Sequence, residues 1–283
     1  MELWIGLSIL YGILGGVTDI FKKKAVQKNQ IIEVLAVYSF LSLLFILPSV
    51  QTLQIDHLSL LLVFLKSVVI FIGFFLSFKM IDKMPISVYS IVLLSKILFS
   101  CLWGSFFLGE QITSIQYIGI AIVIVGLILV NRKTEQKETS RTKWLYILLV
   151  VCAAALISLS VMLDKVITKT ITPVQLQFWY TIFLTFLYWG YKWVRKIPFN
   201  YKKIVHNIWI PLLSITFFVA DRVHFIASAI PESSVTVMTL LRQLSVLVAV
   251  VFGGIIFKEK HIIYKIFCSI IVLFGIFLII FFT

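Results

Sequence analysis

Charged residues are scarce in this sequence, and acidic residues are the scarcest of them. Only 13% of the 283 residues are Asp, Glu, Lys or Arg, and just 12 are acidic. Hydrophobic residues make up 61% of the chain, and the mean hydropathy is +1.08. A soluble domain carries about 25% charged residues. This composition excludes an ordinary water-soluble domain and is typical of an integral membrane protein.

Polar stretches long enough to form a soluble domain are also missing. A bilayer core of about 30 Å requires about 20 apolar residues per helix, and continuous apolar runs predict helices rather than alternating strands. The longest connections between such runs cover residues 131–143 and 192–207. We predict an all-α protein with ten transmembrane helices, at residues 3–21, 31–51, 58–78, 85–107, 113–130, 144–163, 173–191, 207–229, 233–257 and 262–282.

Several catalytic and metal-binding patterns are absent from the sequence. The three cysteines, Cys101, Cys152 and Cys268, fall inside predicted helices, which argues against disulfides and thiolate metal sites. There is no GxxxxGK[ST] motif for ATP, and no nucleophile–His–Asp arrangement or His/Glu metal spacing. We therefore expect no enzyme activity, no cofactor and no metal site.

Basic residues are unevenly distributed along the chain. Nineteen of the 25 Lys and Arg residues lie in the connections that follow predicted helices one, three, five, seven and nine, whereas Lys165 and Lys169 lie on the opposite side. This is the positive-inside pattern of a cell-membrane protein, so the net charge of +13 does not indicate nucleic acid. It predicts that both termini lie outside and that the basic linker lies in the cytoplasm.

The two halves of the sequence resemble each other. "MPISVYSIVLL" with "FFLGEQITSIQYIGIAIVIVGLILV" in the first half is echoed by "LLRQLSVLVAVVFGGIIFKEK" with "LFGIFLII" in the second. Each half has a proline, an apolar run, a glutamate in a turn, expected to cap the following helix or hold the bundle end, and a final span with a glycine. These are Pro85, Glu110 and Gly126, and Pro231, Glu259 and Gly275. Because five spans per half is an odd number, the two repeats are inverted, as in many secondary transporters.

These fragments, in this order and spacing, resemble the ten-span proteins of the drug/metabolite transporter superfamily that contain two EamA domains. The resemblance implies two inverted five-helix repeats around a central cavity, and gradient-driven movement of small metabolites or drugs. It divides the chain into a first EamA-like repeat at 1–131, a linker at 132–143 and a second repeat at 144–283.

Two cations in the predicted helices form a matched pair. A charge at the centre of a membrane helix costs about 2.5–3.5 kcal/mol on insertion scales, so such residues usually have a function. Lys96 and Arg242 each lie eleven residues after the proline of their repeat. Two cations that face one pocket would favour an anionic substrate. Alternatively, Arg242 pairs with Asp221 in a network that includes Arg222 and His224, and both interpretations stay open.

The remaining charged residues of the predicted helices have two interpretations each. Lys66 either snorkels or pairs within the structure, or it lines a cavity. Asp221 and His224 share a helix face and are able to relay a proton, unless His224 is a hydrogen-bonded core residue. Asp19 and Asp164 lie at predicted helix ends, where solvation is the favoured interpretation.

The sequence therefore predicts a monomeric secondary transporter of a small polar metabolite, anionic or amino-acid-like, with Arg242, Lys96, Lys66, Asp221 and His224 as candidate binding or coupling residues. Its expected partners are this small molecule, membrane lipid and, if Asp221 and His224 relay it, a coupling proton. The alternatives are an exporter of hydrophobic cations, a lipid-carrier flippase and a non-transporting membrane scaffold. A scaffold predicts tight packing without a central cavity.

Overall fold

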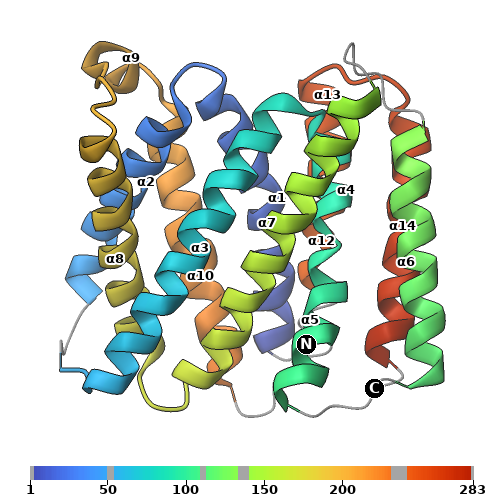
Figure 1. The fold of residues 1–283 in the computed structure, drawn as a ribbon, viewed down its shortest axis with the longest axis horizontal. Coiled ribbons are helices and arrows are strands. Elements are labelled where there is room, and N and C mark those ends of the chain that lie inside the picture. Colours follow the sequence, from blue (N-terminus) through green and yellow to red (C-terminus); the bar gives the residue numbers. More distant parts are fainter. Residues whose placement is uncertain (1–2, 50–53, 109–112, 133–139, 231–240, 282–283) are drawn as a thin grey trace.

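The protein is a bundle of helices, described here from a computed structural model for residues 3–49, 54–108, 113–132, 140–230 and 241–281 (Figure 1). No strand occurs in these ranges, which confirms the all-α prediction for them. In chain order the helices are α1 (Leu3–Val26), α2 (Ile31–Ile46), the 3₁₀ turn η1 (Leu47–Ser49), α3 (His57–Lys83), α4 (Ile86–Leu93), α5 (Lys96–Leu108), α6 (Ser114–Arg132), α7 (Ser140–Ile167), α8 (Pro173–Val194), α9 (Tyr201–Val205), α10 (Trp209–Ala229), α12 (Leu244–Val248), the π-helix η2 (Ala249–Gly253), α13 (Gly254–Ile256) and α14 (Ile262–Phe281).

Apolar segments of membrane-spanning length make up much of the described bundle. Six are long and apolar enough to cross a bilayer in the described residues, namely Leu3–Val26, Ile31–Ser49, His57–Lys83, Ile86–Trp103, Trp144–Asp164 and Trp209–Ala227. Shorter apolar helices cover Tyr117–Leu129, Leu244–Ile256 and Ile262–Leu278. Large apolar side chains also cover the outside: Phe106 is 80% exposed and Ile263 86%. Such a surface suits lipid and not water.

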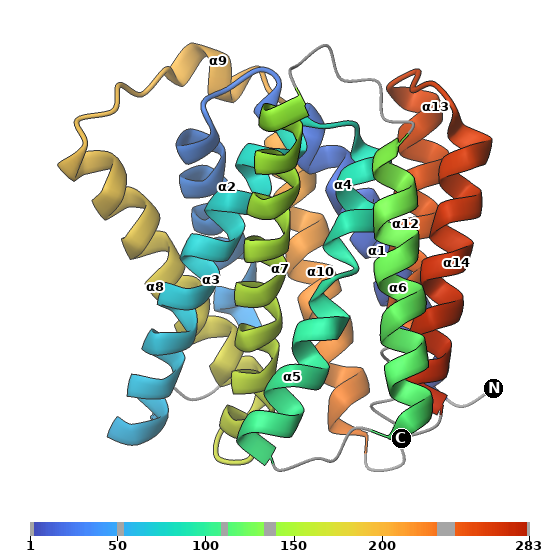
Figure 2. The same ribbon diagram turned by 45° about the vertical axis from the view of Figure 1, so that its right-hand side comes forward.

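Helices from the two halves of the chain pack against each other in matching pairs. Helix α1 packs along α10, and α3 packs along α7; α2 packs against α8, and α6 against α14 (Figures 1 and 2). The first and last described helices, α1 and α14, begin and end at the same end of the bundle, opposite α9 and α13 (Figure 1).

The contact between α6 and α14 is reciprocal. A Cβ added to Gly126 of α6 would lie 2.4 Å from Cγ2 of Val272, and one added to Gly275 of α14 would lie 3.0 Å from Cγ2 of Val123. Each glycine lies three residues after the valine of its own helix. The same short pattern thus serves both helices, and small residues let their backbones approach closely.

The fourth and ninth predicted spans are not continuous helices. Span 85–107 divides into α4 and α5 at a turn, where the N–H of Leu94 bonds the carbonyl of Ile91 at 3.1 Å and that of Ser95 bonds Val92 at 3.0 Å. The ninth span lies partly in 231–240, outside the described residues, and its described part turns at Gln243. At both breaks a backbone N–H donates a hydrogen bond to the carbonyl of the third preceding residue, which tightens the helix. Neither break contains a proline or a glycine that would have predicted it.

Helices α1 and α7 are longer than predicted. The apolar run predicts that the first span ends at residue 21, with Lys22 and Lys23 in the following connection, but α1 continues to Val26 and buries both lysines. Helix α7 likewise continues to Ile167, past the predicted end at residue 163. Charged residues at the predicted ends are therefore inside the helices.

Candidate functional site

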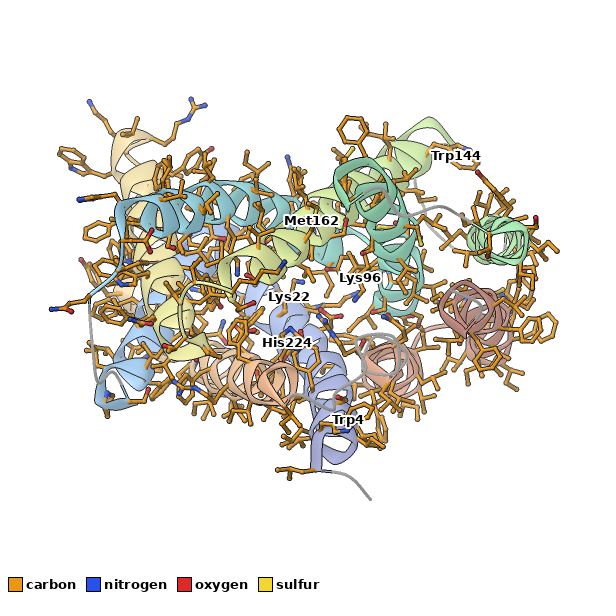
Figure 3. The ribbon with its side chains drawn as sticks, turned by 90° about the horizontal axis from the view of Figure 1, so that it is seen from below. Trp4, Lys22, Lys96, Trp144, Met162 and His224 are labelled. Carbon is orange, nitrogen blue, oxygen red and sulfur yellow. The ribbon has the colours of Figure 1, made fainter. Side chains whose placement is uncertain are left out.

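A cavity of about 250 Å³ lies in the middle of the bundle, between helices from both halves. Seen from below in Figure 3, Lys22, Lys96 and His224 lie near the centre, whereas Trp4 and Trp144 lie at the edge. Apolar side chains, among them Ile70, Phe74 and Phe217, form part of its wall. The charged residues of the lining are Lys22, Lys66, Lys96 and Arg242, and Asp19, Asp164 and Asp221, with His224 beside them.

All five candidate residues named from the sequence line this one cavity. They come from four separate parts of the chain: Lys66 from α3, Lys96 from α5, Asp221 and His224 from α10, and Arg242 from the helical residues just before the turn at Gln243. Their part in substrate binding or coupling stays a prediction. Cations and carboxylates inside a membrane bundle usually face the bundle interior or a water-filled cavity, and these residues line a cavity.

Lys66 and Asp164 form an ion pair on one wall of the cavity. The ammonium of Lys66 also lies 4.4 Å from the centre of the Tyr180 ring, and the hydroxyl of Tyr180 donates to Asp221. Lys66 thus has both roles that the sequence left open, since it pairs internally and lines the cavity. The expected helix-end solvation of Asp164 is wrong, because the longer α7 places the carboxylate in the bundle.

Sequence reasoning missed Lys22, which is only 4% exposed. Its ammonium donates to Ser77 Oγ at 2.7 Å and to the Tyr89 hydroxyl at 2.8 Å, and it lies 3.4 Å from Asp19. Solvation of Asp19 at a helix end is therefore also wrong. The spacing of Asp19 and Lys22 could have predicted this pair, because residues three apart share a helix face if the helix continues past residue 21.

Arg242 contacts an aromatic side chain of α1. Its guanidinium donates to the Tyr11 hydroxyl at 3.3 Å and lies 4.7 Å from the centre of that ring. The Tyr11 ring in turn lies 5.0 Å from the ring of His224. Within the described ranges no ion pair joins Arg242 to Asp221, so that alternative from the sequence is wrong.

Arg222 lies outside this cluster, contrary to the network expected from the sequence. Its Nε donates to Gln177 Oε1 at 3.0 Å, and its Nη2 donates to Ser49 Oγ at 2.7 Å. Because successive residues of a helix point in different directions, the side chain of Arg222 faces α8 and η1 while that of Asp221 faces the cavity.

Lys96 is the first residue of α5, directly after the turn that divides the fourth span. Across the described residues its ammonium has neither a hydrogen bond nor an ion pair, although the side chain lines the cavity. The neighbouring Ser90, which is 2% exposed, also lines the cavity, and its hydroxyl has no partner in the same part of the chain. Two polar groups of the cavity lining thus have no hydrogen-bond partner in that part of the chain.

The end of the bundle near α13 is held by a contact between the halves. The carboxylate of Glu259 accepts from the N–H of Ile86 at 2.5 Å and from the hydroxyl of Ser87, at the start of α4. Lys265 pairs with Glu259 at 3.0 Å. The sequence pattern predicts that Glu259 caps the following helix or holds the bundle end. It caps the start of α4 and not that of α14. Glu110 lies outside the described residues.

Comparison with known proteins gives one family. The sequence profile described as the EamA-like transporter family matches residues 2–132 and 144–281. No curated protein matches the sequence. Among solved structures, one titled only "Crystal structure of protein" has a TM-score of 0.66 at 11% identity, with 96% of this chain and 95% of that chain covered. That similarity concerns the fold alone.

Proposed function

This chain belongs to the EamA-like transporter family, and we propose that it is a secondary active transporter that moves a small polar metabolite by alternating access. Membership makes it a membrane transporter of the drug/metabolite type. The proposal adds the mechanism and the polar nature of the substrate. It also places the protein in the cell membrane as a functional monomer, because one chain encloses the cavity.

One observation carries this proposal: the central cavity holds four basic side chains and three acidic ones within a bundle of largely apolar helices. Such charges are expensive to bury unless they bind each other or a polar solute. The excess of basic groups favours a substrate that carries at least one anionic group. It disfavours a hydrophobic cation, and a cavity of this size disfavours a tightly packed scaffold.

Alternating access requires two halves that can rock against each other around a fixed site, and we propose residues 1–131 and 144–283 as these inverted repeats. The two segments that match the family profile support this division. So do the matching helix pairs and the reciprocal glycine–valine contacts of α6 and α14. The breaks beside Lys96 and Arg242 add support, since discontinuous helices line the midplane sites of many transporters.

A proton is the proposed coupling ion. The Asp221 carboxylate accepts from Tyr180 and lines the same cavity as His224, so a proton and the substrate would share one space. Groups that exchange protons inside a bundle are typical of gradient-driven transporters. The uneven distribution of basic residues supports an orientation with both termini outside the cytoplasm.

Transport by the purified protein in proteoliposomes tests this function. Organic anions, amino acids and cationic dyes are offered with and without a pH gradient, and we expect uptake of anionic or zwitterionic solutes that the gradient increases. Arg242→Gln should lower this uptake by about tenfold or more. Arg222→Gln is the matched control, because this arginine lies outside the cavity, and it should retain uptake. If no solute moves faster than in protein-free vesicles, the proposal is wrong.

A further inference from the structure

The geometry points to a substrate with two anionic groups and one ammonium group, the class of the acidic amino acids. This inference rests on the proposed transport function and specifies its substrate. It follows from which charged groups of the cavity are already neutralised by protein and which are not.

Two ion pairs account for four of the seven charged side chains in the lining. Lys22 lies 3.4 Å from Asp19 and is also bonded to Ser77 and Tyr89. Lys66 pairs with Asp164. An ammonium has three donors, and those of Lys22 already have three acceptors, so this group has little capacity for a ligand.

The two remaining cations, Lys96 and Arg242, lack carboxylate partners in the described part of the chain. Lys96 is at the N-terminus of α5, where the helix dipole makes a cation unfavourable unless an anion lies nearby. Arg242 has five donors, and the Tyr11 hydroxyl takes one. The other donors are suited to the two oxygens of a carboxylate. Together these residues form two positions for anionic groups of a ligand.

The remaining carboxylate is that of Asp221. It accepts from the Tyr180 hydroxyl, and no Lys or Arg of the described residues forms an ion pair with it. Since an ionised carboxylate accepts about four hydrogen bonds, Asp221 is able to bind an ammonium group in addition. The unpartnered hydroxyl of Ser90 provides a further neutral contact on the cavity wall.

Other substrate classes satisfy fewer of these three charges. A dicarboxylate without an amine leaves Asp221 unpaired and places like charges near it. A neutral amino acid leaves one of the two cations without an anion, and a simple amine leaves both. Each unpaired charge in a dehydrated site is costly, so the ligand that pairs all three is preferred.

Binding to the purified full-length protein in nanodiscs tests the inference with L-glutamate and L-aspartate as probes. Three analogues each lack one group: glutarate lacks the ammonium, glutamine lacks the side-chain acid, and 4-aminobutyrate lacks the α-carboxylate. We expect the better of the two acidic amino acids to bind about tenfold or more tightly than every analogue. If any analogue binds as tightly, the assignment is overturned, and this comparison needs no variant.

Two variants then assign the groups. Asp221→Asn should bring the affinities for glutamate and glutarate together, and Lys96→Gln should bring those for glutamate and glutamine together. Arg222→Gln is the matched control and should leave the wild-type order of affinities unchanged. Folded variants that all keep the wild-type order would overturn the assignment of these residues.

Counterflow in proteoliposomes separates this inference from the proposed function. If acidic amino acids bind with the expected order of affinities but are not transported, the proposed transport function is wrong and the inferred ligand class stands. If another class of solute moves while acidic amino acids neither bind nor compete, the ligand class is wrong and transport stands.

Discussion

At the scale of single residues, the charges of the cavity lining that form ion pairs have neighbours that determine what their loss would do. Lys66 and Asp164 are largely buried and form an ion pair, so removal of either one leaves a buried charge without that partner. Charged residues inside apolar runs could be recognised from the sequence because each interrupts a long hydrophobic stretch. Their partners could not, since Tyr180 and Tyr11 reach the site from other helices and a phenol in an apolar segment has no distinctive pattern.

The Lys66–Asp164 pair makes a specific prediction about stability. Lys66→Met should lower the free energy of unfolding by about 3–5 kcal/mol, because it leaves Asp164 buried and unpaired. The double change Lys66→Met with Asp164→Leu should recover most of that loss, since it removes both charges. Unfolding of the two variants in detergent measures this difference. A double variant that is less stable than Lys66→Met would contradict it.

At the scale of helices, hydrophobic runs predicted where the helices lie but not where they break. Residues 94–95 and Gln243 include no proline or glycine, and yet the helix is interrupted by a turn at both places. The close approach of α1 to α12 could not be predicted from the hydrophobic runs either. A Cβ on Gly16 would lie 2.5 Å from Cβ of Val248 and 2.6 Å from the carbonyl oxygen of Ser245, whereas one on Gly6 meets nothing within 4 Å.

These two glycines of α1 form a matched pair for mutation. Gly16→Ala should lower stability by about 1–3 kcal/mol, because backbone atoms of the neighbouring helix must move. Gly6→Ala should leave stability unchanged or raise it by up to about 1 kcal/mol, as alanine favours the helix. Thermal unfolding in detergent compares the two. Equal effects at both positions would show that the contact of α1 with α12 does not require a glycine.

At the scale of the whole molecule, the membrane class and the helical content follow from composition and from the length of the continuous apolar runs, which are properties of the sequence alone. The pairing of α1 with α10 and of α3 with α7 does not follow from these properties. Such pairing depends on which apolar faces fit, and nearly every face of these helices is apolar. The cavity was likewise predicted only as a consequence of family resemblance, because no local pattern specifies an empty space.

Topology provides a prediction for the whole molecule. Alkaline phosphatase, which is active only outside the cytoplasm, should be active when fused after residue 283 and inactive when fused within the linker at 132–143. The physical reason is the excess of Lys and Arg on the side of the linker, which is retained in the cytoplasm. The reverse activities would overturn the orientation while leaving the fold unchanged.

The reciprocal contact of α6 with α14 also affects how the protein is made. Chains emerge from the ribosome N-terminus first, so α6 enters the membrane long before α14. Until then the face of α6 around Gly126 lacks the helix that covers it in the finished bundle. The first half therefore completes its packing only after α14 has entered the membrane, and a chain truncated before α14 leaves this face of α6 without its partner helix.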